Sequence, residues 1–165
     1  IEVMGQQWYW NFRLPGEDGV LGLTDSRNIN DDNPFGINLD DPNGLDDLLI
    51  EGDDLHILNN QPVKVNLRSI DVLHDFYIPQ FRAKMDMVPG MINYYWFTPI
   101  RIGEFEILCA EYCGTSHYAM RGWVKVDEEN EYKEWLSEQT TFEEMMASIG
   151  KSKLIQLALN NKGDK

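Results

Sequence analysis

The stretch Cys109-Ala-Glu-Tyr-Cys113-Gly-Thr-Ser-His117-Tyr-Ala-Met120 is the most informative part of this 165-residue chain. It places two thiolates, an imidazole and a thioether close together, with the spacing C-x3-C-x3-H-x2-M. Thiolate and thioether are soft ligands that select copper, and imidazole also suits copper. The chain has no other cysteine, and His74 in Val-Leu-His-Asp-Phe would add a second nitrogen. The set supplies one thiolate and one histidine per metal if two coppers share the sulfurs.

Three other interpretations of this motif stay open. A structural zinc site fits two cysteines and two histidines, but such sites usually bring their histidines close together and have no use for a methionine. A disulfide between Cys109 and Cys113 would suit a protein outside the cytosol, but it leaves His117 and Met120 unexplained. A mononuclear blue-copper site uses a single cysteine, so the second thiolate is one too many. The pattern therefore favours a binuclear copper site.

The composition indicates one domain with an acidic surface. A hydrophobic content of 42% over 165 residues is enough to bury a core. No segment approaches the roughly 18 consecutive apolar residues of a membrane span, and no N-terminal signal is recognisable. The net charge of −14 repels nucleic acid and attracts cationic partners. Ten acidic residues and one arginine lie between positions 25 and 54, which is either a solvated loop or a surface for a basic partner.

Short alternating segments separated by turn residues predict an all-β sandwich or barrel. We expect a first strand over residues 2–12, an acidic insertion over residues 16–54, and recurring short strands from Leu55 onward. The segment Ile92–Phe97 is apolar on both faces, which predicts a central strand. His56 alternates with apolar neighbours and is expected to face solvent.

The apolar spacing changes to that of a helix after residue 126. The residues at i, i+3 and i+4 are Tyr132, Trp135 and Leu136. Thr141 and Glu144 then form a capping-box pattern, which marks the start of a second helix. We expect a domain over residues 1–126, followed by a helical extension over residues 127–165 with a basic, frayed end. No C-x-x-C-H motif occurs, so no covalent haem is expected.

Four segments in this order resemble the copper-A domain of subunit II of haem–copper cytochrome c oxidases. They are Gln7-Trp-Tyr-Trp10, Asp71-Val-Leu-His-Asp75, Val88-Pro-Gly-Met91 and the stretch Cys109–Met120. The resemblance covers about residues 1 to 138. It implies a cupredoxin-like Greek-key β-barrel, which agrees with the strand pattern. Family members carry two transmembrane helices before this domain, which projects from the cytoplasmic membrane into the periplasm. We therefore expect the chain to be the extracytoplasmic part of a membrane-anchored subunit.

The resemblance also implies how metals are held. It assigns two coppers to six groups: Cys109 and Cys113 as bridges, His74 and His117 as terminal ligands, and Met120 and the backbone carbonyl of Glu111 as weak axial ligands. The Glu111 carboxylate would also help to bind a magnesium ion where subunit II meets subunit I. That magnesium site is expected only in the intact complex.

The function implied by the resemblance is electron transfer from cytochrome c to haem in subunit I. The domain would serve an oxidoreductase complex without turning over alone. Electrons would enter at Trp8, and the family's docking positions correspond to Gln7, Tyr9, Glu17, Asp18 and Asp71. The copper-A domain of nitrous oxide reductase shares the cysteine motif, but the segment Gln7–Trp10 and the absence of a large catalytic domain argue against it. A copper carrier would favour an accessible site, whereas this motif suits a rigid cage.

Overall fold

The computed structural model describes residues 1–160, which fall into two compact units. The first unit comprises residues 1–14 and 49–139, and the second comprises residues 15–48 together with the chain from residue 140 onward. The boundary expected between residues 126 and 127 stays a prediction. The expected frayed end falls on residues 161–165, which lie outside the described residues.

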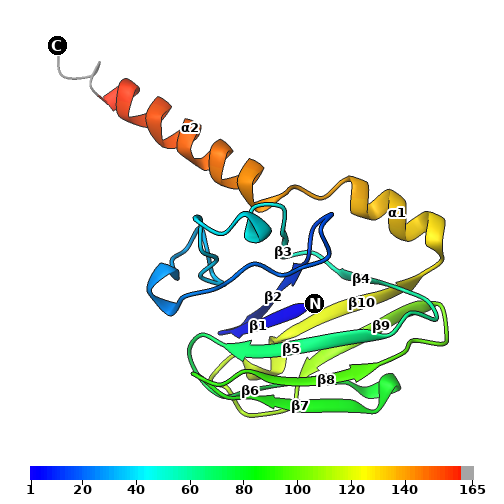
Figure 1. Cartoon of the computed structure of the whole chain (residues 1–165). Helices are drawn as coiled ribbons and strands as arrows, with labels where there is room; N and C mark the ends of the chain where they lie inside the picture. The colour runs from blue at the N-terminus through cyan, green and yellow to red at the C-terminus, as the bar shows by residue number, and fades with distance from the viewer. Residues whose placement is uncertain (161–165) are drawn as a thin grey trace. The chain divides into compact units, whose positions relative to one another are not determined.

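The first unit is built from two five-stranded sheets (Figure 1). One has the order β3 (Leu48–Glu51), β2 (Tyr9–Leu14), β1 (Glu2–Gln6), β5 (Val63–Ser69) and β8 (Asn93–Phe97). The other has the order β4 (Leu55–Leu58), β10 (Arg121–Asp127), β9 (Gly103–Cys109), β6 (His74–Ile78) and β7 (Ala83–Met87). The pairs β1–β5 and β4–β10 are parallel, although their members are far apart in the chain. The expected all-β class is confirmed.

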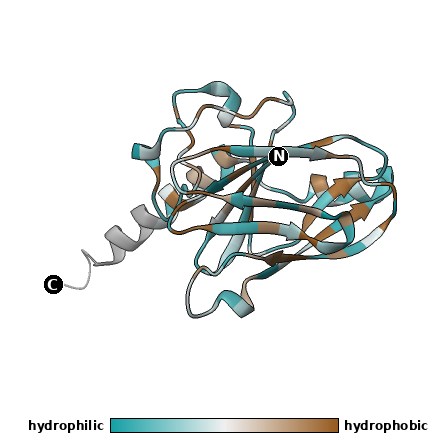
Figure 2. Ribbon diagram, turned by 90° about the horizontal axis from the view of Figure 1, so that it is seen from below, coloured by the Kyte–Doolittle hydropathy of each residue, from teal (hydrophilic) through white to brown (hydrophobic). Residues whose placement is uncertain are grey.

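The core of this unit lies between the two sheets. Hydrophobic and hydrophilic residues alternate along the strands (Figure 2), because successive side chains of a strand point to opposite faces. The side chains that this alternation buries to at most 1% exposure include Val3, Phe12, Val65, Leu67, Phe76, Ile107 and Val124. Both sheets contribute to this list, so the sandwich is closed by hydrophobic contact between them.

An ion pair is also buried in this unit. The guanidinium of Arg13 on β2 lies 2.9 Å from the Glu2 carboxylate on β1, and the two side chains are only 1% and 7% exposed. Arg68 on β5 approaches the other oxygen of the same carboxylate at 3.2 Å. One acidic group therefore joins three neighbouring strands, and its removal would leave a buried cation without that partner.

Two strand predictions were wrong in detail. Residues 2–12 form two strands, because the chain reverses between Gln6 and Tyr9, which pair with each other in the β1–β2 hairpin. The segment Ile92–Phe97 contains β8, which is the edge of its sheet and not a central strand. Tyr94 and Trp96 are 54% and 72% exposed. The outer face of β8 is thus apolar, and no other part of the sandwich buries it.

The helix α1 (Glu129–Ser137) confirms the period change after residue 126. Trp135 is its buried residue, and the indole stacks on the imidazole of His56 with the ring centroids 4.5 Å apart and an interplanar angle of 9°. His56 Nδ1 also lies 2.5 Å from Asp127 Oδ2. The expectation that His56 faces solvent was wrong, because α1 covers this residue of β4.

The second unit contains the greater part of the acidic insertion. Its short 3-10 helices, η1 (Ser26–Asn28) and η2 (Pro42–Gly44), begin at Asp25 and Asp41, whose carboxylates accept backbone N–H bonds. Phe35, Ile37 and Phe142 form its fully buried core. The expected insertion was too long at its end, because residues 48–51 form β3.

A second helix, α2 (Phe142–Asn160), begins where the sequence predicts it. The Glu144 carboxylate accepts from the Thr141 N–H, and the Thr141 hydroxyl accepts from the Glu144 N–H, at 3.2 and 3.3 Å. This reciprocal pair is the capping box. Within residues 1–160, no helix is long and apolar enough to span a bilayer.

Candidate metal centre

Two sulfur atoms form the centre of the candidate site. Cys109 is the last residue of β9, and Cys113 lies in the loop that leads through the 3-10 helix η4 (His117–Ala119) into β10. Their Sγ atoms are 3.7 Å apart, and both cysteines are free and buried. The loop returns Cys113 toward Cys109 because the Cys109 N–H bonds to the carbonyl of Met120 at 3.3 Å. This bond closes the loop at its base.

Each sulfur has its own imidazole and its own weaker donor. Cys109 Sγ lies 3.9 Å from His74 Nδ1 and 3.1 Å from the carbonyl oxygen of Glu111. Cys113 Sγ lies 3.6 Å from His117 Nδ1 and 3.8 Å from Met120 Sδ. Ligand atoms of His74, Cys109 and Cys113 all lie within 4.8 Å of one another. The structure therefore brings together all six groups that the sequence proposes as ligands.

His74 is held from outside the loop. It begins β6, where Phe76 pairs with Cys109 across to β9, so the two ligands are joined by the sheet. Its Nε2 lies 2.8 Å from Asp71 Oδ1, and the other oxygen of Asp71 accepts the Gln7 N–H at 2.7 Å. A carboxylate on one ring nitrogen fixes the tautomer and leaves Nδ1 free to bind a metal. Sequence reasoning assigned Asp71 to docking alone and missed this contact.

The loop also packs against the turn of the β1–β2 hairpin. Gln7 Nε2 donates to the Cys113 carbonyl at 2.8 Å. Gly114 has a φ of +127°, and a Cβ at this position would lie 2.9 Å from Gln7 Nε2 and 3.2 Å from the Trp8 ring. Trp8 therefore lies directly against the residue that follows Cys113. Glycine suits this position because its φ is one that side chains rarely adopt and because a Cβ would press on the Gln7 and Trp8 side chains.

The surroundings shift the pKa values of the two thiols in opposite directions. Burial alone would raise the pKa of Cys109, but hydrogen bonds from His74 and the backbone lower it to about 6. Burial and the neighbouring Cys109 sulfur raise the pKa of Cys113 to about 12. Burial lowers the pKa of His74, but Cys109 and Asp71 outweigh it, and the net shift is upward. Without a metal, the sulfur pair thus favours a single thiolate. A bound metal cation would favour deprotonation of both thiols.

The donor set fits copper by its chemistry. His74, Cys109, Cys113 and Met120 are at most 8% exposed, so the sulfurs are shielded from solvent. Thiolate, thioether and imidazole together match the preference of copper, whereas a zinc site would leave the methionine and the carbonyl unused. A metal held here would lie close to both sulfurs and to both imidazoles. The arrangement can therefore hold one or two soft metal ions.

The proposed docking residues have different surroundings. Tyr9 is 44% exposed, and the Asp71 carboxyl side chain is 27% exposed. Glu17 and Asp18 belong to the second unit, where Asp18 accepts the Val20 N–H in a local turn. The docking role of all these residues, and of Gln7, stays a prediction.

The comparisons with known proteins agree with this geometry. The family model described as cytochrome c oxidase subunit II, periplasmic domain, matches residues 1–126. The alternative cytochrome c oxidase subunit 2 of Bradyrhizobium diazoefficiens is 56% identical over 164 residues, covering 99% of this chain and 58% of that protein. Cytochrome c oxidase subunit 2 of Cereibacter sphaeroides is 32% identical over 149 residues, covering 84% of this chain and 48% of its own length. The chain thus spans about half the length of these relatives.

A solved structure shows the same fold. The crystal structure of the periplasmic domain of subunit II of cytochrome oxidase (CoxB) of Bradyrhizobium japonicum matches with a TM-score of 0.60 and 26% identity. The match covers 83% of this chain and 89% of that one. The expected cupredoxin-like architecture is therefore confirmed. The family model and the 56% identical relative show that the chain belongs to the cytochrome c oxidase subunit II family and contains its periplasmic domain.

Proposed function

We propose that this domain accepts electrons from cytochrome c through a binuclear copper centre and passes them to haem in subunit I. The observation that carries the proposal is the arrangement of the two sulfurs. They lie 3.7 Å apart, and each has an imidazole nitrogen within 4 Å. A donor set with two shared thiolates and two separate imidazoles suits two metal ions better than one.

Six groups would hold the copper pair. Cys109 and Cys113 would bridge the ions, His74 and His117 would bind at the ends, and Met120 and the Glu111 carbonyl would be weak axial ligands. A copper pair bridged by two thiolates would supply one-electron redox chemistry in which the bonds change little. The protein's own contribution is rigidity, since the sheet fixes His74 and Cys109 while the closed loop fixes the other donors.

Trp8 is the proposed point where electrons enter. The ring is partly exposed and lies against Gly114, so one aromatic group joins the surface to the loop that carries Cys113. Gln7 adds a second link, because its side chain bonds to the Cys113 carbonyl. The hairpin turn that holds both residues is thus in direct contact with the metal loop.

Charge supports a cationic partner. The chain carries −14, and a field of this sign steers basic proteins toward it. Gln7, Tyr9, Glu17, Asp18 and Asp71 are the proposed docking residues. A function in the full oxidase also implies a membrane anchor on the same protein, a periplasmic location and contact with subunit I, where the Glu111 carboxylate would bind magnesium.

Copper stoichiometry tests the centre. The loaded chain should bind two coppers and give an EPR spectrum in which one unpaired electron is shared by two nuclei. Cys109→Ser or Cys113→Ser should abolish the shared spectrum, whereas Met120→Leu should keep two coppers and shift the potential. Met91→Leu is the matched control, because Met91 is 55% exposed. A four-line spectrum of a single copper in the fully loaded wild type would refute the binuclear assignment.

Stopped-flow kinetics with reduced cytochrome c tests the partner and the route. Association should slow as salt rises, because the Debye length falls to roughly 10 Å at 0.1 M. Trp8→Ala should leave association nearly unchanged and slow the transfer step, and Trp8→Phe should retain part of the rate. A rate that does not respond to salt would refute electrostatic docking, and wild-type transfer in Trp8→Ala would place the route elsewhere.

A further inference from the structure

A pocket in the β-sandwich unit lies away from the metal site. Its volume is about 420 Å³, which falls within the range of roughly 300–1,000 Å³ that ligand pockets occupy. It lies beside Phe105, and Cys109 is four positions further along β9, or about 13 Å at 3.3 Å per residue. The pocket and the metal centre therefore lie toward opposite ends of the same strand.

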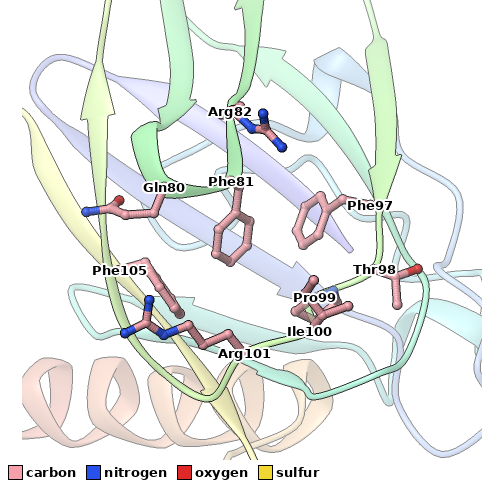
Figure 3. Close-up of a pocket in the computed structure, with 9 residues that line it drawn as sticks. All are labelled: Gln80, Phe81, Arg82, Phe97, Thr98, Pro99, Ile100, Arg101 and Phe105. Carbon is pink, nitrogen blue, oxygen red and sulfur yellow. The ribbon is translucent and has the colours of Figure 1, made fainter.

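Three phenylalanine rings form the apolar part of the pocket (Figure 3). Phe81 meets Phe97 and Phe105 edge to face, with centroid distances of 5.1 and 5.0 Å. All three side chains stay partly exposed, and the neighbouring Ile100 is 82% exposed. A flat apolar body placed on these rings would remove about 25 cal/mol of unfavourable hydration for each Å² that it covers.

Two arginines lie on different sides of these rings. Figure 3 shows Arg82 beyond Phe81 on one side, and Arg101 beside Phe105 on the other. The chain has six arginines, and the other four lie within 2.5–3.2 Å of carboxylates. Within residues 1–160, neither Arg82 nor Arg101 has a carboxylate within 4.0 Å. In a chain with 28 acidic residues, the two arginines that lack an acidic partner line the same pocket.

Arg82 also adopts an unusual backbone conformation. It ends the 3-10 helix η3 (Pro79–Phe81) with a φ of +53° and donates its N–H to the Pro79 carbonyl at 3.0 Å. Long side chains are uncommon in this left-handed region, where glycine and asparagine are easier to accommodate. Such residues persist where the surrounding structure requires them, often next to a binding site. Here the conformation places a guanidinium at the pocket.

We propose that this pocket binds a small organic anion with an aromatic or compact apolar body and a carboxylate. The body would lie on Phe81, Phe97 and Phe105, and the carboxylate would pair with Arg82 or Arg101. A planar guanidinium pairs with a carboxylate through two parallel hydrogen bonds, which a neutral amide cannot match. The ligand site is independent of the copper ligands, and none of its residues takes part in the proposed electron transfer.

Titration of the ¹⁵N-labelled 165-residue chain with phenylacetate tests the proposal. Phenylacetamide, which has the same shape without the charge, is the matched probe. Phenylacetate should shift amide signals of residues 80–82 and 97–105 and leave those of residues 109–120 in place. Phenylacetamide should bind at least tenfold more weakly. Arg82→Gln and Arg101→Gln should be tested singly and together, and the double variant should lose about tenfold in affinity, or roughly 1.4 kcal/mol.

Arg27→Gln is the charge control, because it removes one surface arginine from the second unit. It should bind phenylacetate like the wild type, and the dispersion of the remaining signals reports that each variant is folded. Equal affinity for phenylacetate and phenylacetamide would overturn the anion assignment. Absence of shifts at the pocket, or equal losses in Arg27→Gln and the pocket variants, would overturn the site itself.

Discussion

Gly114→Ala should damage the metal loop through the hairpin turn that packs on it. The new Cβ would lie 2.9 Å from Gln7 Nε2 and 3.2 Å from the Trp8 ring, in a conformation with φ of +127° that side chains rarely adopt. Backbone strain of this kind costs about 1–3 kcal/mol. Loss of the bond from Gln7 to the Cys113 carbonyl adds about 1 kcal/mol. We therefore expect the free energy of unfolding to fall by about 2–4 kcal/mol.

Gly90→Ala is the matched control for this prediction. Gly90 also has a positive φ, +80°, but a Cβ there would meet nothing within 4 Å. It should show only the cost of a left-handed conformation, about 1–2 kcal/mol. Urea unfolding of both variants measures the difference. Copper loading should then give an altered absorption spectrum in Gly114→Ala and a normal one in Gly90→Ala.

The close approach can also be relieved. Adding Gln7→Ala to Gly114→Ala removes the nearer of the two contacts, so part of the copper spectrum should return although the hydrogen bond is lost. If Gly114→Ala were no less stable than Gly90→Ala, and its copper spectrum were normal, the packing of the hairpin turn on the loop would not matter to the site. That result would refute the reasoning.

Three further changes have expected outcomes. Asp71→Ala removes the carboxylate that contacts His74, so copper affinity should fall by about 10–100-fold in a chelator competition. Asp18→Ala is the control and should leave the affinity unchanged; equal affinities of the two variants would contradict the orienting role of Asp71. Glu2→Gln removes the carboxylate that pairs with the buried Arg13 and should cost about 3–5 kcal/mol in urea unfolding, whereas Glu2→Leu with Arg13→Met should recover much of that loss. A cost below about 0.5 kcal/mol would contradict a stabilising role for this ion pair. Trp135→Ala should release α1 and lower the free energy of unfolding by about 3–5 kcal/mol. The measurements are the helical circular dichroism and the melting temperature, and an unchanged melting temperature would show that Trp135 does not anchor the helix.

The clustering of the proposed ligands could be predicted because most of them lie within twelve residues of one another in the sequence. A short loop limits the distances among Cys109, Cys113, His117 and Met120, independently of how the rest of the chain folds. The position of His74 was harder to predict, since its distance from the cysteines depends on the pairing of β6 with β9. The resemblance of its segment to a known family supplied that information.

Other features depend on which surfaces cover one another, and local pattern does not contain this information. Ile92–Phe97 has the composition of a buried strand, yet β8 ends its sheet and leaves Trp96 exposed. His56 has the spacing of an outward-facing residue, yet α1 stacks Trp135 on it. Asp71 has the charge of a docking residue, and its contact with His74 appears only once the turn before β6 has formed. The first two errors concern contacts between residues far apart in the chain, whereas Asp71 and His74 are three positions apart and their contact depends on the conformation of that turn.

The parallel pairing of β1 with β5 and of β4 with β10 delays completion of the two sheets, and burial of the thiols belongs to the same slow assembly. Residues 2–5 must meet residues 66–69, and residues 55–58 must meet residues 124–127, before both sheets are complete. Proteins dominated by such distant pairings fold in milliseconds to seconds, because long loops must close first. His74 and Cys109 are brought together by a further distant pairing, the antiparallel one between β6 and β9. We therefore expect both cysteines to be open to oxidation until the sheets are complete, so that the yield of intact sites depends on the redox conditions under which the chain folds.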